Sequence, residues 1–272
     1  MAKISFIGGG NMATSLIGGL LAQGINPQQV SVSDPSEEQQ AKLKKDFAIA
    51  TFGDNNEAIK DADVVVIAVK PQVMQQVIEP LKDQLAEQQP LIISIAAGIT
   101  IDSIQTWVGD QHAIVRCMPN TPSLIQLGAS GLFANGNTSD EQKKLAENIL
   151  SAVGIVEWVD QEKLIDAVTA VSGSGPAYYF LMMEAMIDAG EKLGLDKETA
   201  AKLTMQTALG AAQMAISSDV DVAELRRRVT SPKGTTEQAI NSFEKDQLRD
   251  VVERALNAAD KRSEELAKEL GV

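Results

Sequence analysis

Short apolar runs alternate with longer segments of helical, polar-faced pattern through roughly the first 160 residues of the chain. This alternation is typical of parallel strands joined by crossover helices. The run VVVIAV at 64–69 is continuously apolar and β-branched, as expected of a central strand that helices cover on both faces. The pattern predicts strands at 3–7, 30–33, 48–51, 64–69, 91–95 and 113–118.

The pattern changes after Val159, where strand-like runs disappear and alanine, leucine, methionine and glutamate predominate to the end of the chain. Asp196 and Asp221 each stand where a helix is expected to begin. The chain is therefore predicted to have an α/β domain at 1–160, which binds a dinucleotide, and an all-helical domain at 161–272. No linker rich in proline and serine separates the two, so we expect them to pack closely.

Composition excludes several classes of function. The chain has 272 residues, 44% of them apolar, which suffices for a sizeable core, and its net charge of -13 opposes binding to nucleic acid or anionic membranes. The longest apolar helical stretch, 177–187, is far shorter than the roughly 20 residues that span a bilayer. The first residues lack the pattern of a signal peptide, so a cytoplasmic location is expected.

Metal and cysteine chemistry are also not expected. Cys117 is the one cysteine and has no internal disulfide partner. With His112 as the one histidine, the chain has too few soft ligands for a structural zinc site. We interpret Cys117 as a buried small hydrophobe and His112 as a structural or exposed residue.

A glycine-rich turn follows the first predicted strand directly. The residues Gly8, Gly9, Gly10, Asn11 and Met12, with alanine next, fit G-x-G-x-x-A and open a helix that is predicted to run to about residue 23. The first glycine permits the tight turn, and the third lets the backbone approach a pyrophosphate. The helix amino terminus then supplies amide hydrogens and a favourable dipole.

The end of the second predicted strand faces the adenine ribose in this arrangement, and here it reads Ser33, Asp34, Pro35, Ser36. The hydroxyls can receive the 2′-phosphate of NADPH, whereas Asp34 would hydrogen-bond the 2′-hydroxyl of NADH and repel the phosphate. A second interpretation is that Asp34 caps the helix that begins near Ser36. The cofactor is therefore expected to be NADPH or NADH, with the choice left open.

Two further strand ends carry candidate cofactor contacts. Lys70 follows the fourth strand, at the carboxyl edge where doubly wound sheets bind ligands. The small residues that begin at Ser94 end the fifth strand and would let a nicotinamide lie close to the backbone.

Six motifs together resemble the pyrroline-5-carboxylate reductase family. They are FIGGGNM at 6–12, AVKP at 68–71, SIAAGIT at 94–100, RCMPNTP at 116–122, SGSGPAYYF at 172–180 and TSPKGTTEQA at 230–239. The resemblance covers nearly the whole chain, and the order and spacing of six motifs make it far more specific than the glycine turn alone.

The resemblance implies a fold and an activity. The fold is an amino-terminal Rossmann-type doubly wound sheet with an all-helical carboxy-terminal dimerisation domain, in homodimers that often assemble into larger rings such as decamers. The activity is NAD(P)H-dependent reduction of (S)-1-pyrroline-5-carboxylate to L-proline, the last step of proline biosynthesis. The enzyme would be an oxidoreductase that acts on a cyclic C=N bond of a small imino acid.

The same resemblance implies which residues form the site. The expected cofactor contacts are Gly8, Gly9, Gly10, Asn11, Met12, Ser33, Asp34, Asn55, Asn56, Ala68, Val69, Lys70, Pro71, Ser94, Ile95 and Ala96. The expected substrate contacts are Glu162, Ser231, Gly234, Thr235 and Thr236. Two positions depart from the family pattern: Lys233 stands where glycine is frequent, and Asp34 stands where serine, threonine or arginine is frequent.

The chemistry of imine reduction suits these residues. A protonated cyclic imine is already electrophilic, so the protein needs mainly to orient it, anchor its carboxylate and give its nitrogen a hydrogen-bond partner. The segment SPKGTT is predicted to open a helix with Ser231 as its N-cap and proline in the first turn, which leaves amides for a carboxylate. Thr236 is the predicted catalytic residue, as the polar partner of the ring nitrogen.

Two other functions would also use an amino-terminal dinucleotide-binding fold. A β-hydroxyacid dehydrogenase also joins an early dinucleotide turn to a helical domain, but it needs a catalytic lysine after its glycine-rich substrate motif, and no lysine occurs between Ser174 and Glu191. A non-catalytic dinucleotide sensor would use the fold for binding alone. It would have no need for a second anion-binding segment such as SPKGTT.

Overall fold

The computed structural model describes residues 2–271, which divide into two compact units. One unit runs to Ser174 and resumes at Ala258, and the other is Gly175–Asn257. The sequence placed its boundary at 160/161. The division comes later because α8 (Leu164–Val168) and the π-helical turn Thr169–Gly173 still pack against strands of the sheet.

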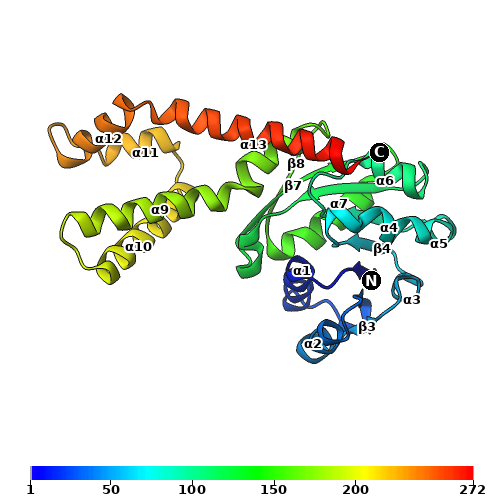
Figure 1. Ribbon diagram of the computed structural model, residues 1–272. Coiled ribbons are helices and arrows are strands. Elements are labelled where there is room, and N and C mark those ends of the chain that lie inside the picture. Colours follow the sequence, from blue (N-terminus) through cyan, green and yellow to red (C-terminus); the bar gives the residue numbers. More distant parts are fainter. Residues whose placement is uncertain (1, 272) are drawn as a thin grey trace. The chain divides into compact units, whose positions relative to one another are not determined.

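The first unit contains an eight-stranded sheet in the order β3-β2-β1-β4-β5-β6-β7-β8 (Figure 1). The first six strands of this order pair in parallel, β7 is antiparallel to β6, and β8 is parallel to β7. The strands are β1 (Ile4–Ile7), β2 (Val30–Ser33), β3 (Ala50–Phe52), β4 (Val64–Ile67), β5 (Leu91–Ser94), β6 (Ile114–Met118), β7 (Gly128–Ala134) and β8 (Gly154–Trp158). The six predicted strands and the doubly wound α/β class are confirmed.

The sequence missed β7 and β8 because neither strand has a marked apolar pattern. β7 reads GASGLFA, and β8 at the sheet edge leaves Ile155 64% exposed. Close backbone contact replaces side-chain packing where the two strands begin. A Cβ added to Gly154 would lie only 2.0 Å from the carbonyl oxygen of Gly128.

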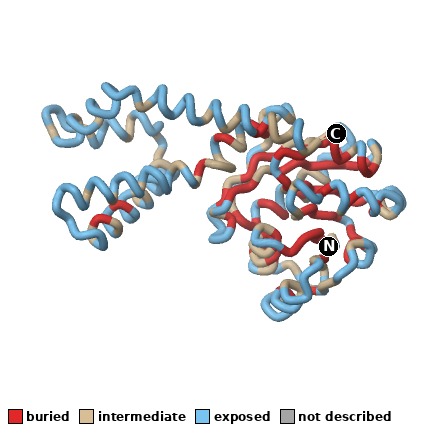
Figure 2. Tube along the Cα trace, viewed as in Figure 1, coloured by how far each residue is buried: buried red, intermediate tan, exposed pale blue. Residues whose placement is uncertain are grey.

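Two separate apolar cores lie on the two faces of the sheet. Successive residues of a strand point to opposite faces, so Val64 and Val66 of β4 join one core while Val65 and Ile67 join the other. Helices cover both faces, which explains why β4 is apolar throughout. Figure 2 shows the strands of this unit as largely buried.

Helices of the first unit begin where short polar side chains accept backbone amides. Ser36 caps α2, Thr100 caps α6, and Ser139 forms a capping box with Gln142 at α7. The helices are α1 (Asn11–Ala22), α2 (Glu37–Phe47), α3 (Asn55–Ile59), α4 (Met74–Ile78), α5 (Lys82–Gln88), α6 (Ile101–Val108), α7 (Asp140–Leu150) and α8, with the last turns of α13 (Leu248–Leu270).

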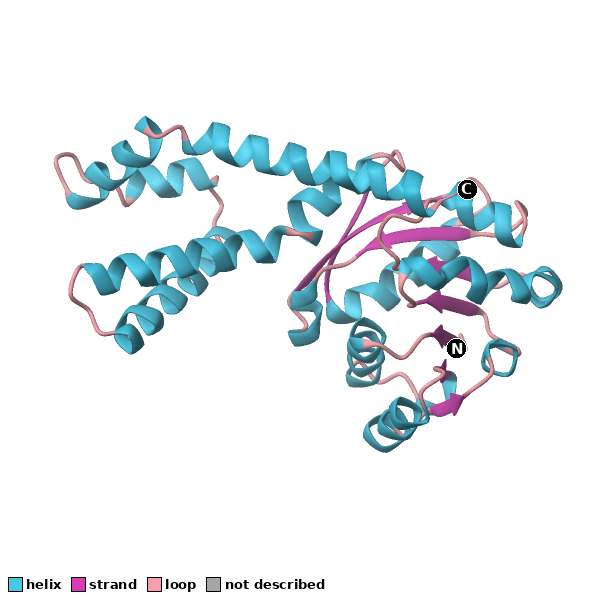
Figure 3. Cartoon of the chain, viewed as in Figure 1, coloured by secondary structure: helices cyan, strands magenta, loops and turns pink. Residues whose placement is uncertain are grey.

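The second unit is all-helical, as predicted (Figure 3). It contains α9 (Gly175–Lys192), α10 (Lys197–Ile216), α11 (Val222–Arg228), α12 (Thr235–Lys245) and the beginning of α13. The predicted helix starts are confirmed, since Asp196 and Asp221 accept amides at the starts of α10 and α11. In the single chain α9 exposes large apolar side chains, with Tyr179 70% and Phe180 63% exposed. Exposed apolar surface of this kind is typical of an interface.

His112 lies fully buried in the first unit, just before β6. Its Nε2 lies 3.1 Å from the carbonyl oxygen of Val108, whereas its Nδ1 has no hydrogen-bond partner in the described part of the chain. Burial lowers the pKa of this imidazole from its ordinary value of 6.5, because a charged ring would lose its hydration.

Stability should therefore fall in mildly acidic solution. The pKa of His112 is lower in the folded than in the unfolded chain, so the unfolded state binds the extra proton first as the pH drops below about 6.5. We expect the midpoint temperature of thermal unfolding to decrease as the pH is lowered from about 7.5 to about 5.5. Ordinary carboxylates do not titrate in this range. His112→Gln should remove most of this slope. An unchanged slope in that variant would contradict the assignment to His112.

Candidate active site

The predicted cofactor residues lie together at one edge of the sheet. Residues Ile7, Ser33, Ile67 and Ser94, at the carboxyl ends of β1, β2, β4 and β5, stand at the same level of the sheet. Backbone bonds continue this alignment past the strand ends, since the amide of Ala68 donates to the carbonyl of Ile7 at 2.8 Å. Doubly wound sheets bind ligands at this edge, where β1 separates β2 from β4.

Gly8 makes the turn that joins β1 to α1. Its φ of +94° lies in the left-handed region, and its amide donates to the carbonyl of Ser33 at 2.8 Å. A Cβ at this position would lie 2.7 Å from the carbonyl oxygen of Ala68. The turn is therefore held between the ends of β2 and β4, and it has no room for a side chain.

The first turn of α1 is open on its outer side. Gly10 is the N-cap residue, offers no side chain to the helix amides, and has no heavy atom within 4 Å of where a Cβ would stand. Unpaired amides at a helix amino terminus attract phosphate oxygens, both by hydrogen bonds and by the helix dipole. The cradle around Gly8 and Gly10 thus fits the pyrophosphate of a dinucleotide.

Asp34 holds the glycine turn from the end of β2. One carboxylate oxygen accepts the amide of Gly9 at 2.9 Å, and the other accepts the amide of Ser36 at 2.9 Å. The side chain of Gln39 also donates to the carbonyl of Gly9. The alternative in which Asp34 caps the following helix is wrong, because the N-cap of α2 is Ser36, whose hydroxyl accepts the amide of Gln39.

The other predicted cofactor residues follow the ends of β3, β4 and β5. Asn55 and Asn56 form the start of α3, directly after β3. Lys70 is exposed and precedes a short 3₁₀ turn that begins at Pro71, so its ammonium can reach solvent at the cofactor edge. The amide of Ile95 donates to the carbonyl of Ile67 at 3.2 Å, which keeps the end of β5 beside β4.

The SPKGTT segment lies in the second unit and forms a tight turn before α12. The helix begins at Thr235 with Gly234 as its N-cap, so the prediction that Ser231 is the N-cap and that proline occupies the first turn is wrong. The carbonyl of Ser231 accepts the amide of Gly234 at 3.0 Å, which places the serine in the preceding turn instead. Gly234 provides no capping side chain, and Thr236 in the first turn is exposed.

Lys233 occupies this turn in a left-handed conformation, with φ of +60°. Its amide donates to the carboxylate of Glu237 at 2.8 Å, a bond that does not need the lysine side chain. Glycine adopts this conformation without the steric cost of a Cβ.

Replacing this lysine should therefore stabilise the protein. We expect Lys233→Gly to raise the free energy of unfolding by about 0.5–1 kcal/mol, since relief of the left-handed strain outweighs the added freedom of the unfolded chain. The matched control is Lys261→Gly in the exposed middle of α13, which should destabilise by about 1 kcal/mol. Thermal unfolding at equal protein concentration measures both, and a loss of stability in Lys233→Gly would contradict the expectation.

Glu162 lies in a partly buried ionic cluster that the sequence did not reveal. Its Oε1 accepts from Arg116 at 2.9 Å and from the amide of Ile101 at 2.8 Å. Asp166 lies 3.9 Å from the same guanidinium and accepts the hydroxyl of Ser263 at 2.6 Å. The one available sign was Arg116 itself, a charged residue within a predicted apolar strand.

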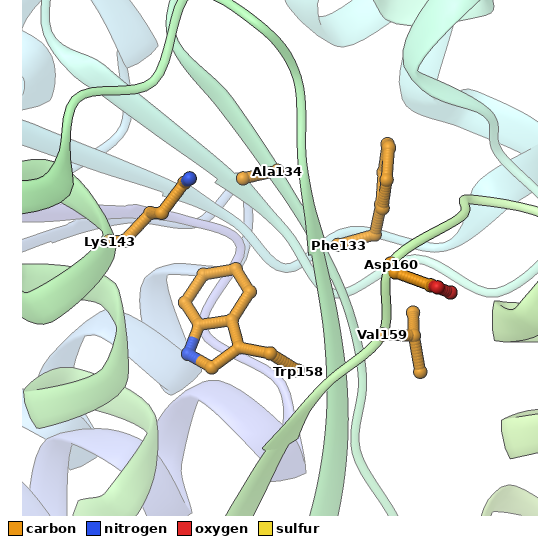
Figure 4. A pocket seen from close by; sticks show the side chains of 6 residues that line it. All are labelled: Phe133, Ala134, Lys143, Trp158, Val159 and Asp160. Atoms are coloured by element: carbon orange, nitrogen blue, oxygen red, sulfur yellow. The ribbon is translucent and has the colours of Figure 1, made fainter.

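Two features of the first unit are unsuited to the chemistry. A cavity of about 280 Å³, lined by the six side chains in Figure 4, lies where β7 and β8 end. Ala134 at that end pairs with Val115 near the start of β6, so the cavity is at the edge opposite to the glycine turn. Burial raises the pKa of the Cys117 thiol to about 12, which leaves it protonated and unreactive.

Comparison with known proteins decides the family. The curated pyrroline-5-carboxylate reductase of Pseudomonas aeruginosa is 60% identical over 269 residues, which cover 99% of this chain and 98% of the relative. The chain belongs to the pyrroline-5-carboxylate reductase family. The reductase of Vibrio alginolyticus is 45% identical and covers 98% of this chain and 98% of its own length.

Solved structures of pyrroline-5-carboxylate reductases share the whole fold. The enzyme from Coxiella burnetii is 49% identical with a TM-score of 0.95, and each chain is covered to 98%. The enzyme from Plasmodium falciparum, solved with NADP bound, is 33% identical with a TM-score of 0.85 and 98% coverage of each chain.

One family model matches the amino-terminal part of the chain, and a second matches the carboxy-terminal part. Residues 3–98 match the model described as NADP oxidoreductase coenzyme F420-dependent, which spans β1 to β5 and every predicted cofactor residue. Residues 162–266 match the model for pyrroline-5-carboxylate reductase dimerisation, so the chain is built to form an oligomer. Within residues 2–271 no helix is both long and apolar enough to cross a membrane, and no group of side chains is arranged to hold a metal ion.

Proposed function

We propose that the protein reduces (S)-1-pyrroline-5-carboxylate to L-proline with NAD(P)H, the last step of proline biosynthesis. The observation that carries the proposal is 60% identity to a curated pyrroline-5-carboxylate reductase over nearly the whole of both chains. The open amides at the start of α1 and the closely packed Gly8 turn support it, because both fit a dinucleotide. The alternative functions, a β-hydroxyacid dehydrogenase and a non-catalytic dinucleotide sensor, account for fewer of the chain's motifs.

The cofactor would lie along the carboxyl edge of the sheet. The Gly8–Gly10 turn would hold the pyrophosphate, and the segment from Ala68 to Pro71 would contact the ribose and diphosphate on the nicotinamide side. Bound there, the reduced nicotinamide supplies the hydride. The small residues after Ser94 leave the backbone accessible to the ring, and this segment would position it for transfer.

The substrate would bind at the turn before α12. The start of this helix has no capping side chain, so its amides can donate hydrogen bonds to the substrate carboxylate, together with the hydroxyls of Ser231 and Thr235. Thr236 would place its hydroxyl beside the ring nitrogen. Hydride adds to the carbon of the protonated C=N bond, and the nitrogen keeps its proton as it becomes an amine, so Thr236 orients the ring and need not be a strong acid.

The experiment that tests the function is oxidation of NADPH and NADH by the purified protein with pyrroline-5-carboxylate, at equal cofactor concentrations. Turnover with either cofactor supports the proposal. Tight cofactor binding without turnover would overturn it in favour of a sensor or a different substrate.

The preference between NADPH and NADH should depend on the position of the Asp34 carboxylate when a cofactor is bound. Its bonds to the amides of Gly9 and Ser36 keep negative charge beside the glycine turn, where it opposes a 2′-phosphate. Comparing the NADPH to NADH ratio in the wild type and in Asp34→Asn tests this effect. The ratio should rise in the variant, because the amide oxygen still accepts a backbone amide but carries no charge.

We further propose that the protein is a cytoplasmic homodimer that assembles into a larger ring such as a decamer. The apolar side chains that α9 exposes in the single chain, among them Tyr179, Phe180 and Leu181, support burial against a second copy. Light scattering on the purified protein measures the assembly, and a monomer would contradict it.

A further inference from the structure

The loop between β5 and α6, residues 95–100, is anchored where it meets the start of α6. Thr100 caps α6 at one end of the loop, accepting the amide of Ser103 at 3.2 Å. The amide of Ile101, the first residue of α6, donates to the carboxylate of Glu162 at 2.8 Å. A carboxylate is favoured there, because the first amides of a helix lack partners within the helix and carry partial positive charge.

Glu162 is itself held by a nearly inaccessible cation. The side chain of Arg116 is 3% exposed and donates to Glu162 at 2.9 Å. The Asp166 carboxylate lies 3.9 Å from the same guanidinium. Displacing Glu162 would leave the buried guanidinium of Arg116 without its closest charged partner, so the cluster opposes movement of this carboxylate. The start of α6 is therefore tied to β6 through two charged side chains.

The end of α13 closes the other side of the cluster. The hydroxyl of Ser263 donates to Asp166 at 2.6 Å, although the two residues are 97 positions apart in the chain. One turn later, Leu266 lies against the loop itself: a Cβ added to Gly98, whose φ is +72°, would be 3.3 Å from the Cβ of Leu266. Leu270 packs into the apolar core on the same face of the sheet.

We propose that Glu162 is a positioning residue, which fixes the β5–α6 loop through the amide of Ile101 so that the loop presents the nicotinamide at the correct place for hydride transfer. Arg116, Asp166 and Ser263 form the support that holds Glu162. The inference rests on the proposed function, since it takes the loop after β5 to be the nicotinamide side of the site. It assigns Glu162 a role different from the substrate contact implied by family resemblance, because two groups of the protein itself, the Ile101 amide and the Arg116 guanidinium, donate to its Oε1.

The test compares Glu162→Ala with Glu162→Gln in the otherwise unchanged chain. In Glu162→Ala, kcat should fall at least about tenfold because the ring is misplaced, while KM for pyrroline-5-carboxylate and the NADPH dissociation constant change less than about threefold. Glu162→Gln should recover kcat to within about threefold, since its amide oxygen can accept the same two donors. The control is Glu87→Ala, which removes an exposed carboxylate from α5 and should leave all three constants unchanged.

A second readout separates this proposal from the proposed function. Fluorescence of bound NADPH reports the surroundings of the nicotinamide without any substrate. Its emission should differ from wild type in Glu162→Ala and return in Glu162→Gln, even if the protein reduces a substrate other than pyrroline-5-carboxylate. Absence of turnover in the wild type would overturn the function, whereas unchanged emission in a folded Glu162→Ala variant would overturn the positioning role.

Two further outcomes also decide the matter. A rise in KM for pyrroline-5-carboxylate of about tenfold or more with kcat retained would make Glu162 a substrate contact and overturn the proposal. If Glu162→Ala does not fold, Ser263→Ala removes one hydrogen bond of the support without removing a charged side chain. It should lower kcat about two- to fivefold with both binding constants retained, and an unchanged kcat would again overturn the proposal.

Discussion

Gly8→Ala is expected to weaken NADPH and NADH binding at least about 100-fold, because the added methyl group meets backbone atoms that cannot move aside. The new Cβ would lie 2.7 Å from the carbonyl oxygen of Ala68 and 2.9 Å from Cγ1 of Val69. The φ of +94° adds left-handed strain. The turn would have to shift, and the amides at the start of α1 would lose their alignment with the pyrophosphate.

Gly24→Ala separates the two causes. Gly24 has nearly the same φ, +92°, but no heavy atom lies within 4 Å of its added Cβ. This control should lose only about 1 kcal/mol of stability and bind both cofactors normally. Titration of the reduced cofactor by fluorescence measures the dissociation constants. A Gly8→Ala variant that binds within about threefold of wild type would show that the turn does not form the pyrophosphate site.

Thr236→Val is expected to lower kcat about 100-fold, because the ring nitrogen of the substrate would lose its hydrogen-bond partner. Valine keeps the shape of threonine and lacks the hydroxyl, and Thr236 is exposed in the first turn of α12, so stability should change little. Steady-state kinetics with saturating cofactor measure the effect. KM for pyrroline-5-carboxylate should rise much less, because the carboxylate anchor at Ser231 and the helix amides remains.

Thr236→Ser is the matched control for the hydroxyl. It restores the polar group without the methyl, so we expect kcat within about fivefold of the wild type. A Thr236→Val variant with more than half of the wild-type kcat would exclude Thr236 as the partner of the ring nitrogen.

Local features of the sequence determined most of the first unit's framework. Six strands were predicted from short runs of strand-forming residues, and β4 is apolar throughout because helices cover both of its faces. Short sequence motifs located the turn at Gly8 and the helix starts at Asp196 and Asp221. Each of these features depends on one residue and its near neighbours in the chain. The carboxyl edge then followed from topology, since parallel strands end at the same side of a sheet.

Other local predictions failed where two arrangements of the same residues were possible. Ser231 and Gly234 are both acceptable N-caps, and the left-handed conformation of Lys233 between them delays the start of α12 to Thr235. Strand β7 has small residues in place of an apolar pattern. It forms because it pairs with β6. β8 can then pair with β7, because Gly128 and Gly154 have no side chains and their backbones can lie in close contact.

By itself the sequence determined the α/β and helical parts, the glycine turn and the six motifs of the family, because each is encoded within a few consecutive residues. The contacts among Arg116, Glu162, Asp166 and Ser263, and the packing of the last turns of α13 with the sheet, became visible in the folded chain alone. Such contacts join residues up to 97 positions apart. No local pattern specifies them, because they depend on how the strands and helices pack once they have formed.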